Sequence, residues 1–260
     1  MMRCTLSVLF LTLVLQSATV AHAQDAEPAP PPAQSTVEEL ERPLIRLIPN
    51  LLRDLRRLPS IETAVTLGIG GGLALATHPV DDTVTEHATA GGDKPFFEVG
   101  NVLGSGWTQI GGAVGTFAVG AIARKRPVIH LGSDLIRAQA LNGVLTQGLK
   151  FAVQRQRPGA TDSNSYSFPS GHTSSTFATA AVVWRHFGWK AGVPASAVGA
   201  WVGAARVQLK RHFLSDVVFG AAIGTVAGRT VTIGHGRRTI VVAPAAVPRG
   251  AALMFTLVER

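Results

Sequence analysis

The residues best suited to chemistry form three short clusters between positions 150 and 216. They comprise cations, a serine-glycine pair, two histidines and a carboxylate. In chain order they are Lys150, Arg157, Ser170, Gly171, His172, Arg206, His212 and Asp216. Arginine offers a planar pair of donors to two oxygens and lysine a compact positive charge, so these cations suit a tetrahedral phosphoryl group. The pattern therefore predicts phosphoryl chemistry at this part of the chain.

The two histidines can divide the work of a covalent reaction. His212 and Asp216 are four residues apart, which places them on one face of a helix. Asp216 can accept a hydrogen bond from one ring nitrogen of His212 and leave the other free as a nucleophile. His172 would protonate the leaving alkoxide and then activate water. Because Pro169 and Gly171 mark a helix start, free backbone N–H groups there would attract the anion.

The expected helices bring the three clusters together. Residues 173–187 and 193–206 predict two helices of similar length, joined by a turn at Gly188, Gly192 and Pro194. Such helices run antiparallel, so Arg206 returns to the level of His172. A helix over 131–150 ends at Lys150. On the next helix, residues 213–228, the stripe Gly220, Gly224 and Gly228 indicates close packing against a neighbour.

In this order, the clusters resemble the three-part signature of the type 2 phosphatidic acid phosphatase superfamily, which includes lipid phosphatases, acid phosphatases and vanadate-dependent haloperoxidases. Ala205 departs from the pattern, because a serine commonly precedes the motif arginine. The resemblance implies that Lys150, Arg157, Ser170, Gly171 and Arg206 bind phosphate. It also implies that His172 is the acid/base and that His212 with Asp216 is the nucleophile pair.

The fold class that we expect is all-α, a six-helix bundle of this phosphatase kind over residues 59–232. The first two helices are expected at 61–77 and 107–123, with a polar loop over 78–101 between them. A basic amphipathic segment precedes the bundle at 37–58, and it could pack on the core or lie on an anionic membrane. A β-rich extension follows at 233–260, with strands at 239–242 and 252–258.

The N-terminus is typical of an exported protein. Residues 1–23 combine Arg3, a short apolar run and Ala21-His22-Ala23, as in a cleaved signal peptide. A retained N-terminal anchor is the alternative. Residues 24–36 are rich in proline, alanine and acidic residues, which predicts a flexible linker. We expect a periplasmic or cell-envelope location. The alternative is an integral inner-membrane protein whose active site faces the periplasm.

Composition limits the partners. The formal net charge of +8 favours an anionic partner, but 6% aromatic residues with a single tyrosine make nucleic acid a poor candidate. Phosphate esters or an anionic membrane surface suit the charge better. A metal site of His172, His212 and Asp216 is disfavoured because the nearby cations would repel a divalent ion. Arg155, Lys210 and Arg211 are interpreted as solvated residues at the mouth of the site.

The sequence thus predicts a metal-independent phosphomonoesterase that works through phosphohistidine, needs no cofactor and is inhibited by vanadate. Its substrate would be a lipid phosphate, such as phosphatidic acid or an isoprenoid phosphate, or a soluble ester. Two alternatives stay open. The first is a vanadate-dependent haloperoxidase, since vanadate would occupy the same site. The second is a non-catalytic membrane or scaffold protein that keeps the fold.

Overall fold

The computed structural model describes residues 47–90, 94–159, 166–232, 238–247 and 250–259. The predicted signal peptide (1–23), the predicted linker (24–36) and residues 37–46 of the basic segment lie outside the described residues. The ordered elements begin with α2 (Leu47–Arg57), α3 (Ile61–Thr77), the short 3₁₀ helix η1 (His78–Val80), α4 (Asp81–Ala90) and α5 (Lys94–Leu103). They continue with α6 (Gly106–Ile122), α7 (Arg126–Val153), α8 (Gly171–Phe187), α9 (Trp189–Gln208) and α10 (Leu214–Val231).

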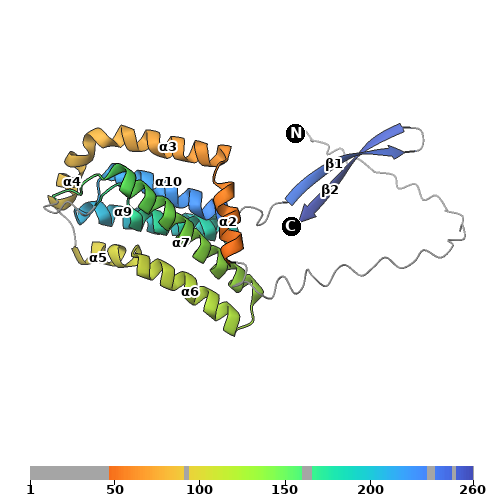
Figure 1. The fold of residues 1–260 in the computed structure, drawn as a ribbon, viewed down its shortest axis with the longest axis horizontal. Helices are drawn as coiled ribbons and strands as arrows, with labels where there is room; N and C mark the ends of the chain where they lie inside the picture. Colours follow the sequence, from red (N-terminus) through yellow and green to blue (C-terminus); the bar gives the residue numbers. More distant parts are fainter. Residues whose placement is uncertain (1–46, 91–93, 160–165, 233–237, 248–249, 260) are drawn as a thin grey trace, which may run out of the picture. The chain divides into compact units, whose positions relative to one another are not determined.

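The helical fold class is confirmed, but the count of six helices is too low for the described part of the chain. The six predicted helices are present as α3, α6, α7, α8, α9 and α10 (Figure 1). The predicted polar loop over 78–101 is wrong, because it contains η1, α4 and most of α5. Asp81 and Asp82 occupy the first turn of α4, where acidic side chains interact favourably with the helix dipole.

Two helix boundaries also differ from the expectation. Helix α7 begins at Arg126, with a proline in its first turn, where the missing N–H costs nothing. Helix α9 begins at Trp189, so the turn after α8 is Gly188 alone, with φ +76. Glycine adopts this left-handed conformation without steric penalty. Pro194 lies inside α9 and does not end it.

Helix α8 lies at the centre and sets the register of its neighbours. Methyl groups added to Gly192, Gly199 and Gly203 of α9 would contact Trp184, Phe177 and Thr173 of α8, in that order. The contacted residue numbers of α8 decrease as those of α9 increase, which shows that the two helices run antiparallel. Their antiparallel course, predicted from the short turn, is therefore confirmed, and it returns Arg206 to the level of His172.

Helix α10 packs parallel to α8 along its glycine stripe. Methyl groups added to Gly220, Gly224 and Gly228 would lie 2.7, 2.0 and 2.4 Å from the carbonyl oxygens of Ser170, Ser174 and Ala178. No side chain fits at such separations, so the predicted close packing of this stripe is confirmed. As a result, the first turns of α8 and α10 meet the last turn of α9 at one end of the bundle.

The remaining helices surround this centre. Helix α3 packs against α10, α6 against α7, and α5 against α9, as Figure 1 shows for α3 beside α10 and α6 beside α7. Helix α2 is held by a buried ion pair, in which Arg137 of α7 binds Asp54 and also Asp134. The C-terminal residues form two strands, β1 (Arg238–Val247) and β2 (Gly250–Glu259), paired antiparallel with Arg238 opposite Glu259.

Candidate active site

His212 and Asp216 form the core of the site. Both are buried, with 2% and 0% exposure. The Nδ1 atom of His212 lies 3.7 Å from Oδ2 of Asp216, beyond direct hydrogen-bond distance. The Ser167 hydroxyl contacts both groups: it donates to Asp216 Oδ2 and lies 3.5 Å from His212 Nδ1. The two side chains thus come together, but the predicted direct hydrogen bond between them is absent, and Ser167, which the sequence did not indicate, is a third member of the group.

Three donors orient the Asp216 carboxylate. Its Oδ2 accepts from the Ser167 hydroxyl and from the backbone N–H of Phe213, the latter at 2.8 Å. Its Oδ1 accepts from the Arg155 guanidinium at 2.8 Å. The carboxylate is therefore held in one orientation before any substrate binds.

Arg155 is not a solvated mouth residue, so that interpretation is wrong. Its side chain is 21% exposed and bridges Asp216 to Asp81, each at 2.8 Å. Its NH1 also donates to the Ser215 hydroxyl at 2.7 Å, and its guanidinium lies 4.0 Å from the centre of the Phe213 ring. Lys210 and Arg211, by contrast, are exposed as expected.

Asp81, at the start of α4, completes this support. It is buried at 2% exposure and accepts from the Ser215 backbone N–H at 2.9 Å and from the Ser215 hydroxyl at 2.5 Å. Since Ser215 directly precedes Asp216, Asp81 fixes the first turn of α10 through both the backbone and Arg155.

The three predicted phosphate-binding cations reach the same end of the bundle. The Lys150 ammonium donates to the backbone oxygens of Tyr166 and Ser167, at 2.7 and 3.4 Å. Arg206 is 5% exposed and binds the side-chain oxygen of Asn101 on α5. The loop after Arg206 folds back, so that the His212 N–H donates to the Arg206 carbonyl at 3.2 Å. Arg157 lies in the loop after α7, half-buried.

The start of α8 contributes the remaining predicted residues. The Ser170 N–H donates to the Asp216 carbonyl at 3.0 Å, which joins α8 to α10. The Ser170 hydroxyl is fully buried and lies 2.9 Å from the Thr173 hydroxyl. Gly171 and His172 form the first residues of α8. A methyl group on Gly104, just after α5, would lie 3.1 Å from Cβ of His172, so α5 ends against this histidine.

Electrostatics keep His212 neutral. Burial, together with repulsion from Arg206 and Lys150, lowers its pKa to about 4, although Asp216 opposes this shift. Burial and repulsion from Arg211 likewise lower the pKa of Arg157. A neutral imidazole at neutral pH is the protonation state that nucleophilic attack requires.

Comparison with known proteins decides the family. Residues 131–240 match the PAP2 superfamily model, and these residues include every predicted site residue. This segment belongs to the PAP2 superfamily. The resemblance drawn from the three clusters is therefore confirmed.

Individual proteins are similar to parts of this chain. A lipid A 1-phosphatase of Porphyromonas gingivalis is 36% identical over 101 residues, which is 38% of this chain but only 22% of that protein. The crystal structure of a transmembrane PAP2-type phosphatidylglycerolphosphate phosphatase from Bacillus subtilis has a TM-score of 0.52 at 22% identity, over 66% of this chain and 94% of that chain. The structure of LpxE from Aquifex aeolicus has a TM-score of 0.49 at 24% identity, over 58% and 94% of the two chains.

Three residues of the candidate site escaped the sequence analysis, Asp81, Asn101 and Ser167, and a fourth, Arg155, was misinterpreted. Asp81 and Asn101 fall in the segment mistaken for a loop, and they lie before the family segment. Arg155 and Ser167 stand within two residues of motif residues, Arg157 and Pro169, which was the available signal. Among the described residues, no three His, Cys, Asp or Glu side chains gather as a metal site would require; metal independence stays a prediction.

Proposed function

We propose that this PAP2 protein is a lipid phosphatase that hydrolyses a phosphate monoester through a phosphohistidine at His212. The observation that carries the proposal is a buried, neutral histidine whose Nδ1 faces Asp216 and Ser167, while cations lie around it. That arrangement leaves Nε2 to attack phosphorus. A surface His and Asp pair at helical spacing would have neither the burial nor the surrounding cations.

The proposed reaction has two steps. In the first, Nε2 of His212 forms a bond to phosphorus, the ester P–O bond breaks, and the leaving alkoxide takes a proton from His172. In the second, His172 accepts a proton from water, the water oxygen attacks phosphorus and the P–N bond breaks, which releases inorganic phosphate. Lys150, Arg157 and Arg206 would neutralise the equatorial oxygens in both transition states.

Two buried arginine nitrogens support an anionic substrate. Within the described residues, the Nε atoms of Arg157 and Arg206 are buried without a hydrogen-bond partner. A buried charged donor without an acceptor costs free energy, and a phosphoryl oxygen would satisfy it. Both nitrogens belong to residues that the family motif assigns to phosphate.

A lipid is favoured as the leaving group for two reasons. The relative from Porphyromonas gingivalis is a lipid A 1-phosphatase, and this chain exposes apolar side chains along whole helices. On α3, Ile61, Val65, Ile69, Leu73 and Leu75 are 52–77% exposed. On α6, Trp107, Ile110, Val114, Val119 and Ile122 are 50–90% exposed. Apolar side chains in such continuous rows are typical of a surface that contacts lipid.

We therefore propose that the bundle lies in a membrane, the alternative location that the sequence analysis left open. Helices α3 and α6 have 17 residues each, near the lower limit for a span of about 17–25 residues. By length and composition alone, α10 is the one described helix that could cross a bilayer, or one of two if the bent pair of α2 with residues 61–90 counts as a span. Since α10 is mostly buried in the bundle, the exposed rows on α3 and α6 carry this part of the proposal.

The decisive experiment compares two histidine variants on two substrates. His212→Ala should abolish hydrolysis of a lipid phosphate and of an aryl phosphate, together with any acid-trapped phosphoenzyme. His172→Ala should impair the lipid phosphate far more, by about a hundred- to ten-thousandfold, because an aryl leaving group departs without a proton. A phosphate label on His172, or equal impairment on both esters, would refute these roles. Release of the protein from membranes by alkaline carbonate would refute the membrane location.

A further inference from the structure

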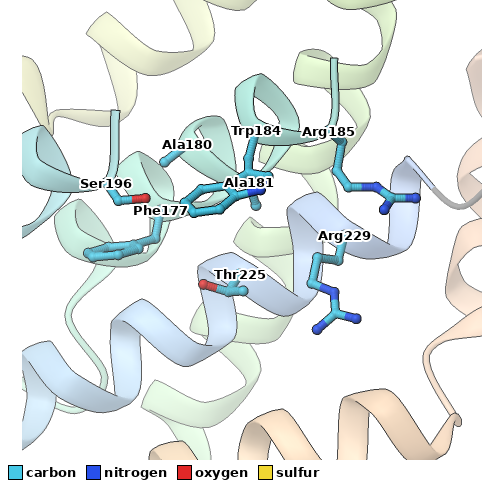
Figure 2. Close-up of a pocket in the computed structure, with 8 residues that line it drawn as sticks. All are labelled: Phe177, Ala180, Ala181, Trp184, Arg185, Ser196, Thr225 and Arg229. Carbon is cyan, nitrogen blue, oxygen red and sulfur yellow. The ribbon is translucent and has the colours of Figure 1, made fainter. Parts of the chain in front are cut away.

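A pocket lies in the half of the bundle away from the candidate active site. It has a volume of about 390 Å³ and opens between α8, α9 and α10, and Figure 2 shows its lining side chains. Ser170 and Arg185 are fifteen residues apart along the chain and the intervening residues are helical, so the two ends are separated by about 20 Å. The volume falls within the range of about 300–1,000 Å³ that is typical of ligand pockets.

The lining is apolar on one side and cationic on the other. Phe177, Ala180, Ala181 and Trp184 of α8 form the apolar part, while Arg185 and Arg229 both lie toward one edge (Figure 2). Trp184 packs over Gly192, where a methyl group would lie 2.4 Å from the indole ring. The indole is therefore fixed as a wall of the pocket, although it is 43% exposed.

Arg229, at the cationic edge, can accept an anion at low cost. Arg229 pairs with Glu62 at 3.3 Å, but both side chains are about half exposed. Such exposed ion pairs contribute little to stability, about 0–1 kcal/mol, so a phosphate oxygen can compete for the guanidinium. Arg185 reaches the same edge from the last turn of α8.

The end of the bundle that contains this pocket also carries other basic and aromatic side chains. Arg124 and Lys125 lie in the turn between α6 and α7, and Lys190 lies in the first turn of α9. Phe187 and Trp189 flank the α8–α9 turn and are 58% and 65% exposed. Cations with exposed tryptophan are typical of the level where a bilayer meets water on its anionic face.

We propose that this pocket binds an anionic phospholipid of the surrounding bilayer, with the phosphodiester at Arg185 and Arg229 and an acyl chain along Trp184 and Phe177. The proposal rests on the membrane location proposed above, but not on the reaction. The order of groups fits a bilayer, because the arginines lie at the ends of α8 and α10 while Phe177 lies two turns deeper. The bound lipid would join α8, α9 and α10 at the end away from the reaction.

The test measures ligand-induced thermal stabilisation of the full chain in detergent. Dioctanoyl phosphatidylglycerol is the probe, dioctanoyl phosphatidylcholine the zwitterionic comparison without net charge, and inorganic phosphate the phosphate group alone. Phosphatidylglycerol should raise the melting temperature as its concentration increases, and phosphatidylcholine should have little effect. Any stabilisation by inorganic phosphate, which also fits the candidate active site, should be the same in the variant that lacks both pocket arginines. Arg185→Gln with Arg229→Gln should weaken phosphatidylglycerol binding roughly tenfold or more, because two charge-assisted contacts are lost.

Matched variants distinguish binding in this pocket from binding elsewhere on the protein. Lys190→Gln removes a basic residue at the same end that does not line the pocket, and it should bind phosphatidylglycerol as the unmodified chain does. Ala181→Phe fills the apolar side while both arginines remain, and it should also lose binding. This variant decides the question if the arginine variants do not fold.

Two results would overturn the proposal. The first is that the arginine variant and Ala181→Phe both bind phosphatidylglycerol as strongly as the unmodified chain. The second is that binding is lost in Arg206→Ala instead, which would place the lipid in the active site. Hydrolysis is assayed in parallel. If the full chain binds phosphatidylglycerol in this pocket but shows no phosphatase activity, the proposed reaction is refuted and the proposal for this pocket is unaffected.

Discussion

Replacing Arg155 by methionine should impair the proposed nucleophile His212, although His212 itself is unchanged. The substitution keeps an unbranched apolar stem but removes the guanidinium and the 2.8 Å contacts that join Asp216 to Asp81. Both carboxylates are almost fully buried, at 0% and 2% exposure. Removal of one partner from a buried ion pair typically costs about 3–5 kcal/mol, because the other charge stays buried without compensation. Arg155 serves two carboxylates, so we expect a loss of stability in this range.

The effect on catalysis should appear in kcat. Without Arg155, Oδ1 of Asp216 loses its donor, and the carboxylate beside His212 is held at Oδ2 alone, by Ser167 and the Phe213 N–H. Misplacement of a reacting group by about 1 Å can cost roughly a hundredfold in rate. We therefore expect kcat per folded molecule to fall about a hundredfold on an aryl phosphate. KM should change little, because Lys150, Arg157 and Arg206 still bind phosphate.

Three further measurements decide whether Arg155 acts through Asp216. Urea unfolding gives the fraction of folded protein, so that kcat is not confused with misfolding. Arg155→Lys should recover part of the activity, since it restores the charge but cannot bridge two carboxylates as the guanidinium does. Asp81→Asn combined with Arg155→Met should cost less than the sum of the single changes. Unchanged kcat and stability in Arg155→Met, or strictly additive effects in the cycle, would refute this reasoning.

Three other predictions follow from the same geometry. Since burial lowers the pKa of His212 to about 4, kcat/KM should fall on the acid side near pH 4 rather than near the usual pKa of about 6.5. Two esters with different phosphate pKa values distinguish this fall from ionisation of the substrate. A fall that stays near pH 6.5 for both esters would contradict the prediction. Gly224→Ala places a methyl group 2.0 Å from the Ser174 carbonyl oxygen, so thermal unfolding should show a loss of stability of about 1–3 kcal/mol or more. In the control Gly72→Ala, the added methyl group has nothing within 4 Å, and the stability should be unchanged or slightly higher. Because the phosphate-binding charges are side chains, a chelator should leave phosphate release unchanged and vanadate should inhibit competitively; activity that is lost with chelator and restored by a divalent ion would exclude this account.

The part of the site that the sequence predicted is the part that helix periodicity controls. The return of Arg206 along α9 and the glycine stripe of α10 follow from 3.6 residues per turn and one tight turn. His212 lies just before α10, which begins at Leu214, so its place beside Asp216 depends on how the chain enters that helix. Asp81 and Asn101 lie 134 and 105 residues from their partners Ser215 and Arg206, and no local pattern joins them. Their segment was mistaken for a loop because Pro79 and Gly91-Gly92 suggested breaks, whereas α4 fits between those residues and α5 begins after them.

Backbone pairing within the connection between α7 and α8 explains why Ser167 and Arg155 act together. The Ser167 N–H donates to the Arg155 carbonyl at 2.6 Å, and Gln156 pairs with Tyr166 as an isolated bridge. This backbone pairing brings the side chains of Ser167 and Arg155 to opposite oxygens of Asp216. The loop that carries Arg157, which we propose to bind phosphate, thus also sets the orientation of Asp216 beside His212. Binding of phosphate by Arg157 and orientation of His212 by Asp216 therefore depend on one backbone segment, and a change that displaces this loop should impair both together.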